Sequence, residues 1–180
     1  MNWANLVTYF RILIIPVVVV SYHSELVHSH LIAAALFALA SLSDWLDGYL
    51  ARRLDLTSEF GAFLDPVADK LLVVTVLILL VGEINLLLLP ATVIIAREML
   101  ISALREWMAS RGNREAVAVA FSGKLKTTFQ MVAIIVLMLV TDSTPDWLLM
   151  TGYVMIYVAA TLSLYSALNY FKAARPFLFP

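Results

Sequence analysis

The segment from Leu31 to Leu50 reads LIAAALFALASLSDWLDGYL. Its first twelve residues are almost wholly apolar, and its full length matches the roughly 20 residues that an α-helix needs to cross the hydrocarbon core of a bilayer. Two carboxylates, Asp44 and Asp47, lie near its end. The segment therefore predicts a membrane-spanning helix that carries negative charge toward one side of the membrane.

The composition extends this interpretation to the whole chain. Of its 180 residues, 62% are hydrophobic and 14% are charged, whereas soluble domains average roughly 45–50% apolar residues. A cytosolic globular protein is therefore excluded, and the net charge of −1 offers no basic field for nucleic acid. Cysteine is absent, which leaves carboxylates and histidines as side-chain metal ligands. The first ten residues lack Lys and Arg, so we expect no removable signal peptide.

Six apolar stretches, separated by polar turns, have the length of membrane spans. They are Leu6–Tyr22, Leu31–Leu50, Phe60–Val81, Leu86–Trp107, Val117–Leu139 and Trp147–Tyr170. No linker rich in Pro, Gly or Ser divides the chain, so we expect one domain over residues 1–180. The predicted fold is an all-α integral membrane protein of six transmembrane helices.

The distribution of basic residues predicts the orientation. Segments 22–30, 82–85 and 141–146 contain no Lys or Arg, and all 12 basic residues lie in or near the alternate ends of the spans. Lys and Arg accumulate on the cytoplasmic side of membrane proteins. Both termini are therefore expected in the cytoplasm.

Four carboxylates form a pattern across the second and third spans. Asp44 and Asp47 are three residues apart, and Asp65 and Asp69 are four apart, so each pair occupies one helix face. An antiparallel helix pair would bring all four together, where their repulsion calls for a counter-charge. Oxygen ligands of this kind suit Mg²⁺ or Mn²⁺, and two ions could be held. The alternative is pairing with basic residues at a solvated helix end, namely Arg52, Arg53 and Lys70.

Small residues accompany these acids. Gly48 and Ala51 share a helical stripe with Asp44, and Gly61 precedes Asp65 by four residues. Small side chains allow a flat ligand to approach the backbone, so a binding groove beside the acids is predicted. Close packing of the two helices is the alternative explanation.

The segment Asp44-x2-Asp47-Gly48-x2-Ala51-Arg52-x8-Gly61-x3-Asp65-x3-Asp69 resembles the signature of the CDP-alcohol phosphatidyltransferase family. The resemblance implies six transmembrane helices, usually in a homodimer, and displacement of CMP from a CDP-linked lipid by an alcohol. It also implies that Asp44, Asp47, Asp65 and Asp69 hold divalent metal at the diphosphate. Asp69 is further implied as the general base for the incoming hydroxyl.

The resemblance also implies a nucleotide site. Its residues would be Asn5, Thr8, Asp44, Gly48, Ala51, Arg52 and Gly61. The opening Asn5-x2-Thr8-x2-Arg11 is similar to the short amphipathic N-terminal segment of the family, which contacts the diphosphate. A cytoplasm-facing site in a bacterial inner membrane is the implied location.

Two further segments narrow the acceptor. Ile94-Ile-Ala-Arg97-Glu98 and Gly123-Lys124-x-Lys126-Thr127-Thr128-x-Gln130 look like those of bacterial family members that use glycerol 3-phosphate. The expected reaction joins glycerol 3-phosphate to the phosphatidyl group of CDP-diacylglycerol, giving phosphatidylglycerophosphate and CMP. Inositol phosphate, serine or phosphatidylglycerol are alternative acceptors. A divalent-cation transporter is an alternative of another class, but it predicts charge through the whole membrane depth.

A phosphate acceptor requires cations in addition to the metals. The candidates are Arg11, Arg97, Arg105, Lys124 and Lys126. A charge in mid-span, as at Arg97, needs a partner or a wet cavity, and Arg105 follows two turns later on the same face. Alternatively, Arg97 forms a structural pair with Glu98 or a neighbouring helix, and Lys124 serves membrane topology alone.

No nucleophile pair of the Ser/His or Cys/His type is evident, because the three histidines, His23, His28 and His30, lie in a predicted outer loop. A single direct displacement is therefore expected, with a carboxylate taking the hydroxyl proton. His28 and His30 could bind a metal, although ordinary interfacial polarity explains them as well.

Overall fold

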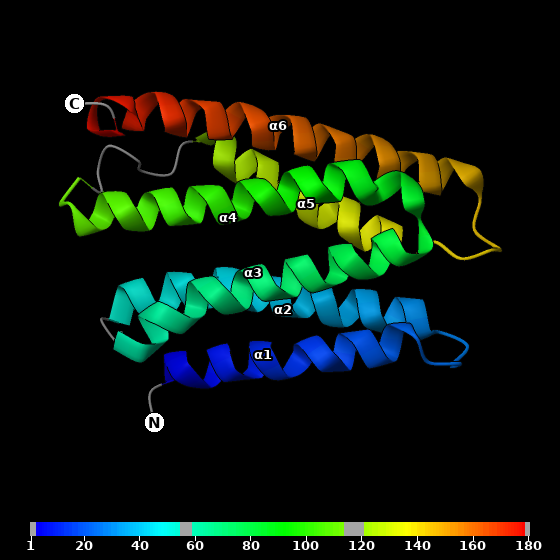
Figure 1. Ribbon diagram of the computed structural model, residues 1–180. Helices are drawn as coiled ribbons and strands as arrows, with labels where there is room; N and C mark the ends of the chain where they lie inside the picture. The colour runs from blue at the N-terminus through cyan, green and yellow to red at the C-terminus, as the bar shows by residue number, and fades with distance from the viewer. Residues whose placement is uncertain (1–2, 55–58, 114–120, 179–180) are drawn as a thin grey trace.

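The computed structural model describes the backbone of residues 3–54, 59–113 and 121–178, and their side chains except for 3–8, 44–54, 59–66, 69 and 121–125. All regular structure within these ranges is helical (Figure 1). The elements are α1 (Trp3–Tyr22), α2 (Ser29–Leu54), α3 (Glu59–Glu83), the 3-10 turn η1 (Asn85–Leu87), α4 (Leu88–Ser110), α5 (Phe121–Met138) and α6 (Asp146–Leu178). The all-α prediction is confirmed for the described residues.

Each predicted span corresponds to one helix, but several helices are longer than the spans. α2 continues to Leu54 and α6 to Leu178, because a helix can continue beyond the apolar stretch that the bilayer requires. At 1.5 Å per residue the 33 residues of α6 extend about 50 Å, more than the roughly 30 Å of a hydrocarbon core. The N-terminal segment is the first part of α1 rather than a separate element.

The helices run along one common direction and form a bundle (Figure 1). α1 packs against α2 and α3, α5 against α6 and α2, and α4 against α6. α1 begins and α6 ends at the same end of the bundle (Figure 1), which we call the terminal end. The opposite end, where α1 ends and α2 begins, is called the distal end.

Apolar side chains lie both inside and outside the bundle. Phe37, Leu77 and Ile134 are fully buried in one core that draws on all six helices. Leu13 and Val20 are 67% and 70% exposed on the outer surface of α1. A large apolar outer surface is costly in water but is the normal surface of a protein in lipid.

Two of the described helical segments are long and apolar enough to cross a bilayer by length and composition. They are Asn85–Ser110 and Asp146–Leu178, and shorter apolar helices cover Tyr9–Tyr22, Ser29–Ser43 and Lys126–Met138. The structure therefore agrees with a membrane protein in general terms.

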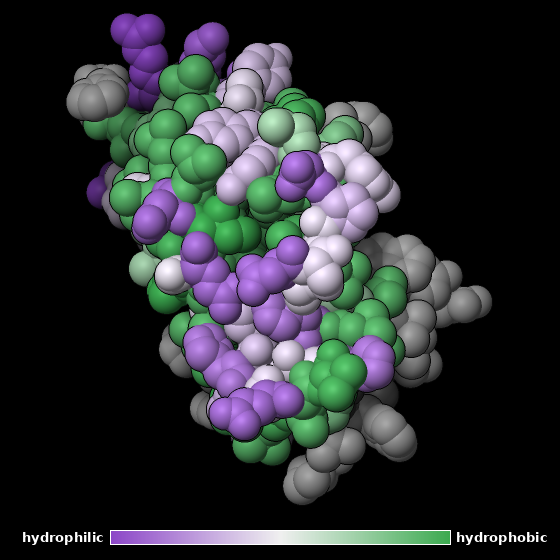
Figure 2. Space-filling model, turned by 90° about the vertical axis from the view of Figure 1, so that its right-hand side faces the viewer, coloured by the Kyte–Doolittle hydropathy of each residue, from purple (hydrophilic) through white to green (hydrophobic). Residues whose placement is uncertain are grey.

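Polar contacts connect the helices at the distal end. The Tyr22 hydroxyl donates to Glu83 at 2.7 Å, and His30 Nδ1 lies 3.1 Å from the carbonyl oxygen of Met138. Figure 2 looks onto this end and shows hydrophilic side chains gathered across its middle, with apolar side chains around them. Because His30 contacts the α5 backbone, its polarity has a structural explanation. No group of three acidic or histidine side chains suited to a metal occurs among the described residues.

Gly112 ends α4 at the terminal end. Its φ of 75° is in the left-handed region that residues other than glycine rarely adopt. The amides of Gly112 and Asn113 donate to the carbonyl oxygens of Ala109 and Met108 at 3.1 and 2.9 Å. This arrangement is a typical glycine C-terminal cap.

Gly152 permits close contact between α5 and α6. A Cβ atom at this position would lie 2.6 Å from Leu137 Cδ2 and 2.8 Å from Leu137 Cγ. Leu137 is fully buried, so it has little room to move. Small residues at helix contacts are typical of membrane bundles.

We expect Gly152→Ala to lower the free energy of unfolding in detergent by about 1–3 kcal/mol relative to Gly82→Ala, because Leu137 must be displaced. Gly82 is the control, since an added Cβ there meets nothing within 4 Å and the position is likewise helical. Chemical unfolding monitored by circular dichroism measures the difference. Equal stabilities for the two variants would contradict the close α5–α6 contact.

Candidate active site

The backbone places Asp44 of α2 and Asp69 of α3 at similar distances from the terminal ends of their helices. Asp44 lies ten residues before the end of α2, and Asp69 lies ten residues after the start of α3. At 1.5 Å per residue both are about 15 Å from the terminal end of their helix. The side chains of Asp44, Asp47, Asp65 and Asp69 are outside the described residues, so their convergence stays a prediction.

The predicted nucleotide residues also lie outside the described side chains. Asn5 and Thr8 belong to α1, Gly48, Ala51 and Arg52 to α2, and Gly61 to α3. All six are within about three turns of a helix end at the terminal end of the bundle. Their roles likewise stay predictions.

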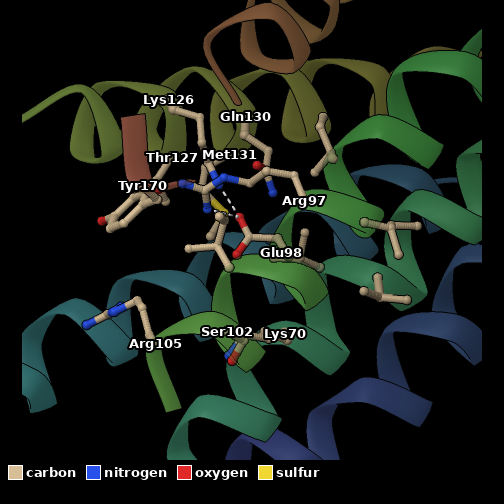
Figure 3. Close-up of a pocket in the computed structure, with 15 residues that line it drawn as sticks. Lys70, Arg97, Glu98, Ser102, Arg105, Lys126, Thr127, Gln130, Met131 and Tyr170 are labelled. Carbon is tan, nitrogen blue, oxygen red and sulfur yellow. Dashed lines mark hydrogen bonds and ion pairs between the residues drawn. The ribbon is translucent and has the colours of Figure 1, made fainter. Parts of the chain in front are cut away.

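A cavity of about 290 Å³ opens between α3, α4, α5 and α6. Among the side chains that the structure describes, four basic groups and one carboxylate line it, together with apolar side chains (Figure 3). The charged residues are Lys70, Arg97, Glu98, Arg105 and Lys126. With four positive groups and one negative group, the lining is suited to an anion of more than one charge.

Arg97 is buried at 8% exposure and has partners on two helices. Its Nη2 donates to Ser166 Oγ of α6 at 2.8 Å, and its Nη1 lies 3.4 Å from Glu98 Oε1. Its guanidinium carbon is 5.7 Å from the centre of the Tyr170 ring, within the range of a cation–π interaction. These contacts fix the guanidinium at the cavity wall.

Glu98 connects α4 to α5. Its Oε1 accepts from Lys126 Nζ and from the Arg97 guanidinium, as the dashed lines in Figure 3 indicate. Lys126 is only 2% exposed, so its ammonium group needs a counter-charge close by. One carboxylate thus holds two buried cations, one from each helix.

Arg105 is less constrained than Arg97 and Lys126. It is exposed, and Figure 3 shows its guanidinium set apart from the Arg97–Glu98–Lys126 group. It lines the same cavity, as its spacing of two helical turns from Arg97 predicts. Lys70 lines the cavity from α3 and is the immediate chain neighbour of Asp69.

The structure brings together three of the five predicted acceptor-side cations. Arg97, Arg105 and Lys126 line one cavity. Arg11 is buried in α1 at 2% exposure and does not line that cavity, because α1 packs on the opposite side of α3 and against α2. The Lys124 side chain lies outside the described residues.

The structure confirms the structural explanation for Arg97, and its binding of an acceptor phosphate stays a prediction. The structural pair with Glu98 exists, and a neighbouring helix contributes Ser166 as a second partner. Arg97 nevertheless lines the cavity. A mid-span arginine can therefore be held by structural contacts and still present charge to a ligand.

Comparisons with known proteins identify the family of this chain. A family model described as CDP-alcohol phosphatidyltransferase matches residues 1–165. The chain belongs to this family. The chain is 45% identical over 176 residues to the CDP-diacylglycerol–glycerol-3-phosphate 3-phosphatidyltransferase of Escherichia coli strain K12, covering 97% of this chain and 95% of the relative.

Two further relatives carry the same name. The Pseudomonas fluorescens protein is 46% identical over 181 residues, covering 99% of this chain and 92% of the relative. The protein from Salmonella typhimurium strain LT2 is 44% identical over 176 residues, covering 97% and 95%. The similarity therefore extends through the helices that form the cavity of this CDP-alcohol phosphatidyltransferase family member.

The sequence assigned no site role to several residues of the cavity of this family member, although Gln130 belongs to a motif quoted above. Gln130 and Tyr170 line it, and Ser166 holds Arg97. The available signal was helical spacing, since Gln130 follows Lys126 by four residues and Tyr170 follows Ser166 by four. Spacing alone does not reveal which face of α6 meets α4.

We expect Ser166→Ala to lower the free energy of unfolding by about 1.5–3 kcal/mol, because it removes a hydrogen bond to a buried charge. Ser163→Ala is the matched control: Ser163 is fully buried on the same helix, and its Oγ has no hydrogen-bond partner within the described part of the chain. Thermal unfolding of the purified variants in detergent compares them. A Ser163→Ala variant as unstable as Ser166→Ala would contradict the assigned role of the Arg97 contact.

Proposed function

We propose that this protein transfers the phosphatidyl group of CDP-diacylglycerol to glycerol 3-phosphate, giving phosphatidylglycerophosphate and CMP. The observation that carries the proposal is the cavity lined by Arg97, Arg105 and Lys126. Lys70, the residue that follows Asp69 in the chain, lines the same cavity. Membership of the family and the names of the relatives support the same reaction.

The cavity favours a small phosphate monoester as the acceptor. Its volume of about 290 Å³ is at the lower limit of small-molecule pockets, which span roughly 300–1,000 Å³. Its excess of positive groups complements the two negative charges of a phosphate monoester. Serine carries no net negative charge, and phosphatidylglycerol brings two acyl chains, so both suit this cavity less well.

The four aspartates are proposed to hold Mg²⁺ or Mn²⁺, in a site of two ions. Asp44, Asp47, Asp65 and Asp69 form a donor set made only of carboxylates, which fits hard divalent cations. Such ions, when bound, neutralise charge on the non-bridging oxygens of a diphosphate. The chain then has to supply the nucleotide contacts and a proton acceptor.

Asp69 is proposed as the general base. In a direct displacement, the acceptor hydroxyl oxygen forms a bond to the phosphatidyl phosphorus while the bond from that phosphorus to CMP breaks. The hydroxyl proton must move to a group within hydrogen-bonding reach. Support for Asp69 comes from Lys70, which lies next to it in the chain and lines the acceptor cavity.

The nucleotide is proposed to bind beside the aspartates. Contacts would come from Asn5, Thr8, Asp44, Gly48, Ala51, Arg52 and Gly61, as the family resemblance implies. Arg11 and Lys124 are retained as further cations for the substrate phosphates. Placement of all these residues toward the terminal end of the bundle supports one continuous site.

We also propose that all six helices span a bacterial inner membrane as one domain, residues 1–180, with both termini and the active site on the cytoplasmic side. The 12 basic residues and the shared end at which α1 begins and α6 ends support this topology. A homodimer is proposed from the family resemblance.

The purified protein is expected to release CMP from CDP-diacylglycerol in detergent micelles with Mg²⁺ when glycerol 3-phosphate is added. Inositol phosphate, serine and phosphatidylglycerol, supplied separately at the same concentration, are expected to give at least about tenfold less CMP, because serine lacks the phosphate charge and the other two are bulkier than glycerol 3-phosphate. Chromatography of CMP and of the lipid product measures the outcome. Preference for another acceptor would overturn the assignment of glycerol 3-phosphate.

We expect Asp69→Asn to fold normally and to lower the rate of CMP release by at least about 100-fold, because loss of a general base removes a factor of roughly 10²–10⁴. Asp142→Asn is the control, since Asp142 is exposed at the distal end. Initial rates and size-exclusion profiles are compared for the two variants. A wild-type rate in Asp69→Asn would remove Asp69 as the base.

A further inference from the structure

Gln130 is a buried polar residue of the cavity. Because it is uncharged, the attraction of cations for a phosphate does not explain its presence. Its side chain is 3% exposed, yet it lines the cavity. Its Oε1 has no hydrogen-bond partner among the residues that the structure describes. A buried amide oxygen left without a hydrogen bond costs about 1–3 kcal/mol, so its presence here calls for a ligand group that donates to it.

Helix geometry places Gln130 beside the phosphate-binding cations. It follows Lys126 by four residues on α5, so the two side chains share one helix face about 5–6 Å apart. Figure 3 shows both reaching from α5 toward the Arg97 side chain. A ligand phosphate held by Arg97 and Lys126 would therefore have its next few atoms close to the Gln130 amide.

The chemistry of the amide indicates what it would bind. An uncharged amide adds nothing to the attraction of a phosphate, but it can accept a hydrogen bond from a hydroxyl and donate one to it. Glycerol 3-phosphate carries two hydroxyl groups. One of them reacts with the phosphatidyl group, and the central one does not.

We propose that Gln130 binds the non-reacting central hydroxyl of the acceptor and so selects a glycerol phosphate from other small phosphate monoesters. This inference rests on the proposed function, because it assigns a specificity residue within the proposed acceptor cavity. Sites built to hydrogen-bond a substrate hydroxyl discriminate strongly against the analogue that lacks it, since the buried partner is then left unpaired.

The test compares two acceptors on three proteins. The acceptors are glycerol 3-phosphate and 3-hydroxypropyl phosphate, which keeps the phosphate and the reacting hydroxyl but lacks the central one. The proteins are the wild type, Gln130→Met, which has similar length but forms no comparable hydrogen bond, and Arg105→Ala. The value of kcat/KM for each acceptor is measured by CMP release at saturating CDP-diacylglycerol.

We expect the wild type to prefer glycerol 3-phosphate by about tenfold, as the loss of one buried hydrogen bond implies. Gln130→Met should abolish this preference by lowering kcat/KM for glycerol 3-phosphate, with little change for 3-hydroxypropyl phosphate. Arg105→Ala should lower both values and leave their ratio unchanged, because both acceptors carry the phosphate. Gln130→Leu provides a second apolar variant if the methionine variant folds poorly.

The possible results distinguish a failure of the role of Gln130 from a failure of the proposed reaction. A wild type that uses both acceptors equally, or a Gln130→Met variant that keeps the tenfold ratio, would overturn the role of Gln130 and leave the proposed reaction intact. Equal losses on both acceptors in Gln130→Met would show a general structural role and would also overturn it. A wild type that releases no CMP with either acceptor would contradict the proposed function itself.

Discussion

The cavity depends on one carboxylate shared by two buried cations. Glu98 accepts from Lys126 of α5 and from Arg97 of α4, and both cations are buried. Taking an unpaired charge out of water costs several kcal/mol, so neither cation could be placed at this depth without a partner. Glu98 cancels only part of the positive charge, since Lys70 and Arg105 also line the cavity. The cavity therefore still attracts an anion, while Glu98 stabilises the buried cations in its wall.

Helix packing determines which charged side chains come into contact. Arg97 and Glu98 are consecutive in α4, so their Cα–Cβ bonds point about 100° apart around the helix, and only long side chains can turn toward the same cavity. Ser166 of α6 is a second hydrogen-bond partner of Arg97. α6 lies close because it packs on both α4 and α5, with Gly152 at the α5 contact. Gly152, which is remote from the charges, thus lets α6 lie close to α5.

The number and type of the helices could be predicted from the sequence, because crossing a bilayer imposes a length and a composition on each segment. Arg97 and Arg105 could be assigned to one face from their spacing alone. The Glu98–Lys126 pair could not, since its partners are 28 residues apart and the register between α4 and α5 is set by core packing rather than by either segment. Arg11 does not line the cavity of Arg97 and Lys126, because α1 packs against α2 and α3, and its role stays a prediction. The roles of the four aspartates rest on motif spacing and on their matching helix depths.

In the proposed acceptor site, charge and hydrogen bonding contribute differently to recognition. Fixed cations act over several ångströms and attract any phosphate monoester, so they contribute affinity but little discrimination among phosphates. Discrimination requires a group that forms a hydrogen bond with the correct substrate. The same group is left without a hydrogen bond by an analogue that lacks the matching hydroxyl. A neutral amide such as Gln130, one helical turn from Lys126, has this property, whereas a further lysine at the same position would bind every phosphate more tightly. A cavity that combines the two kinds of group can be both strongly attractive and selective.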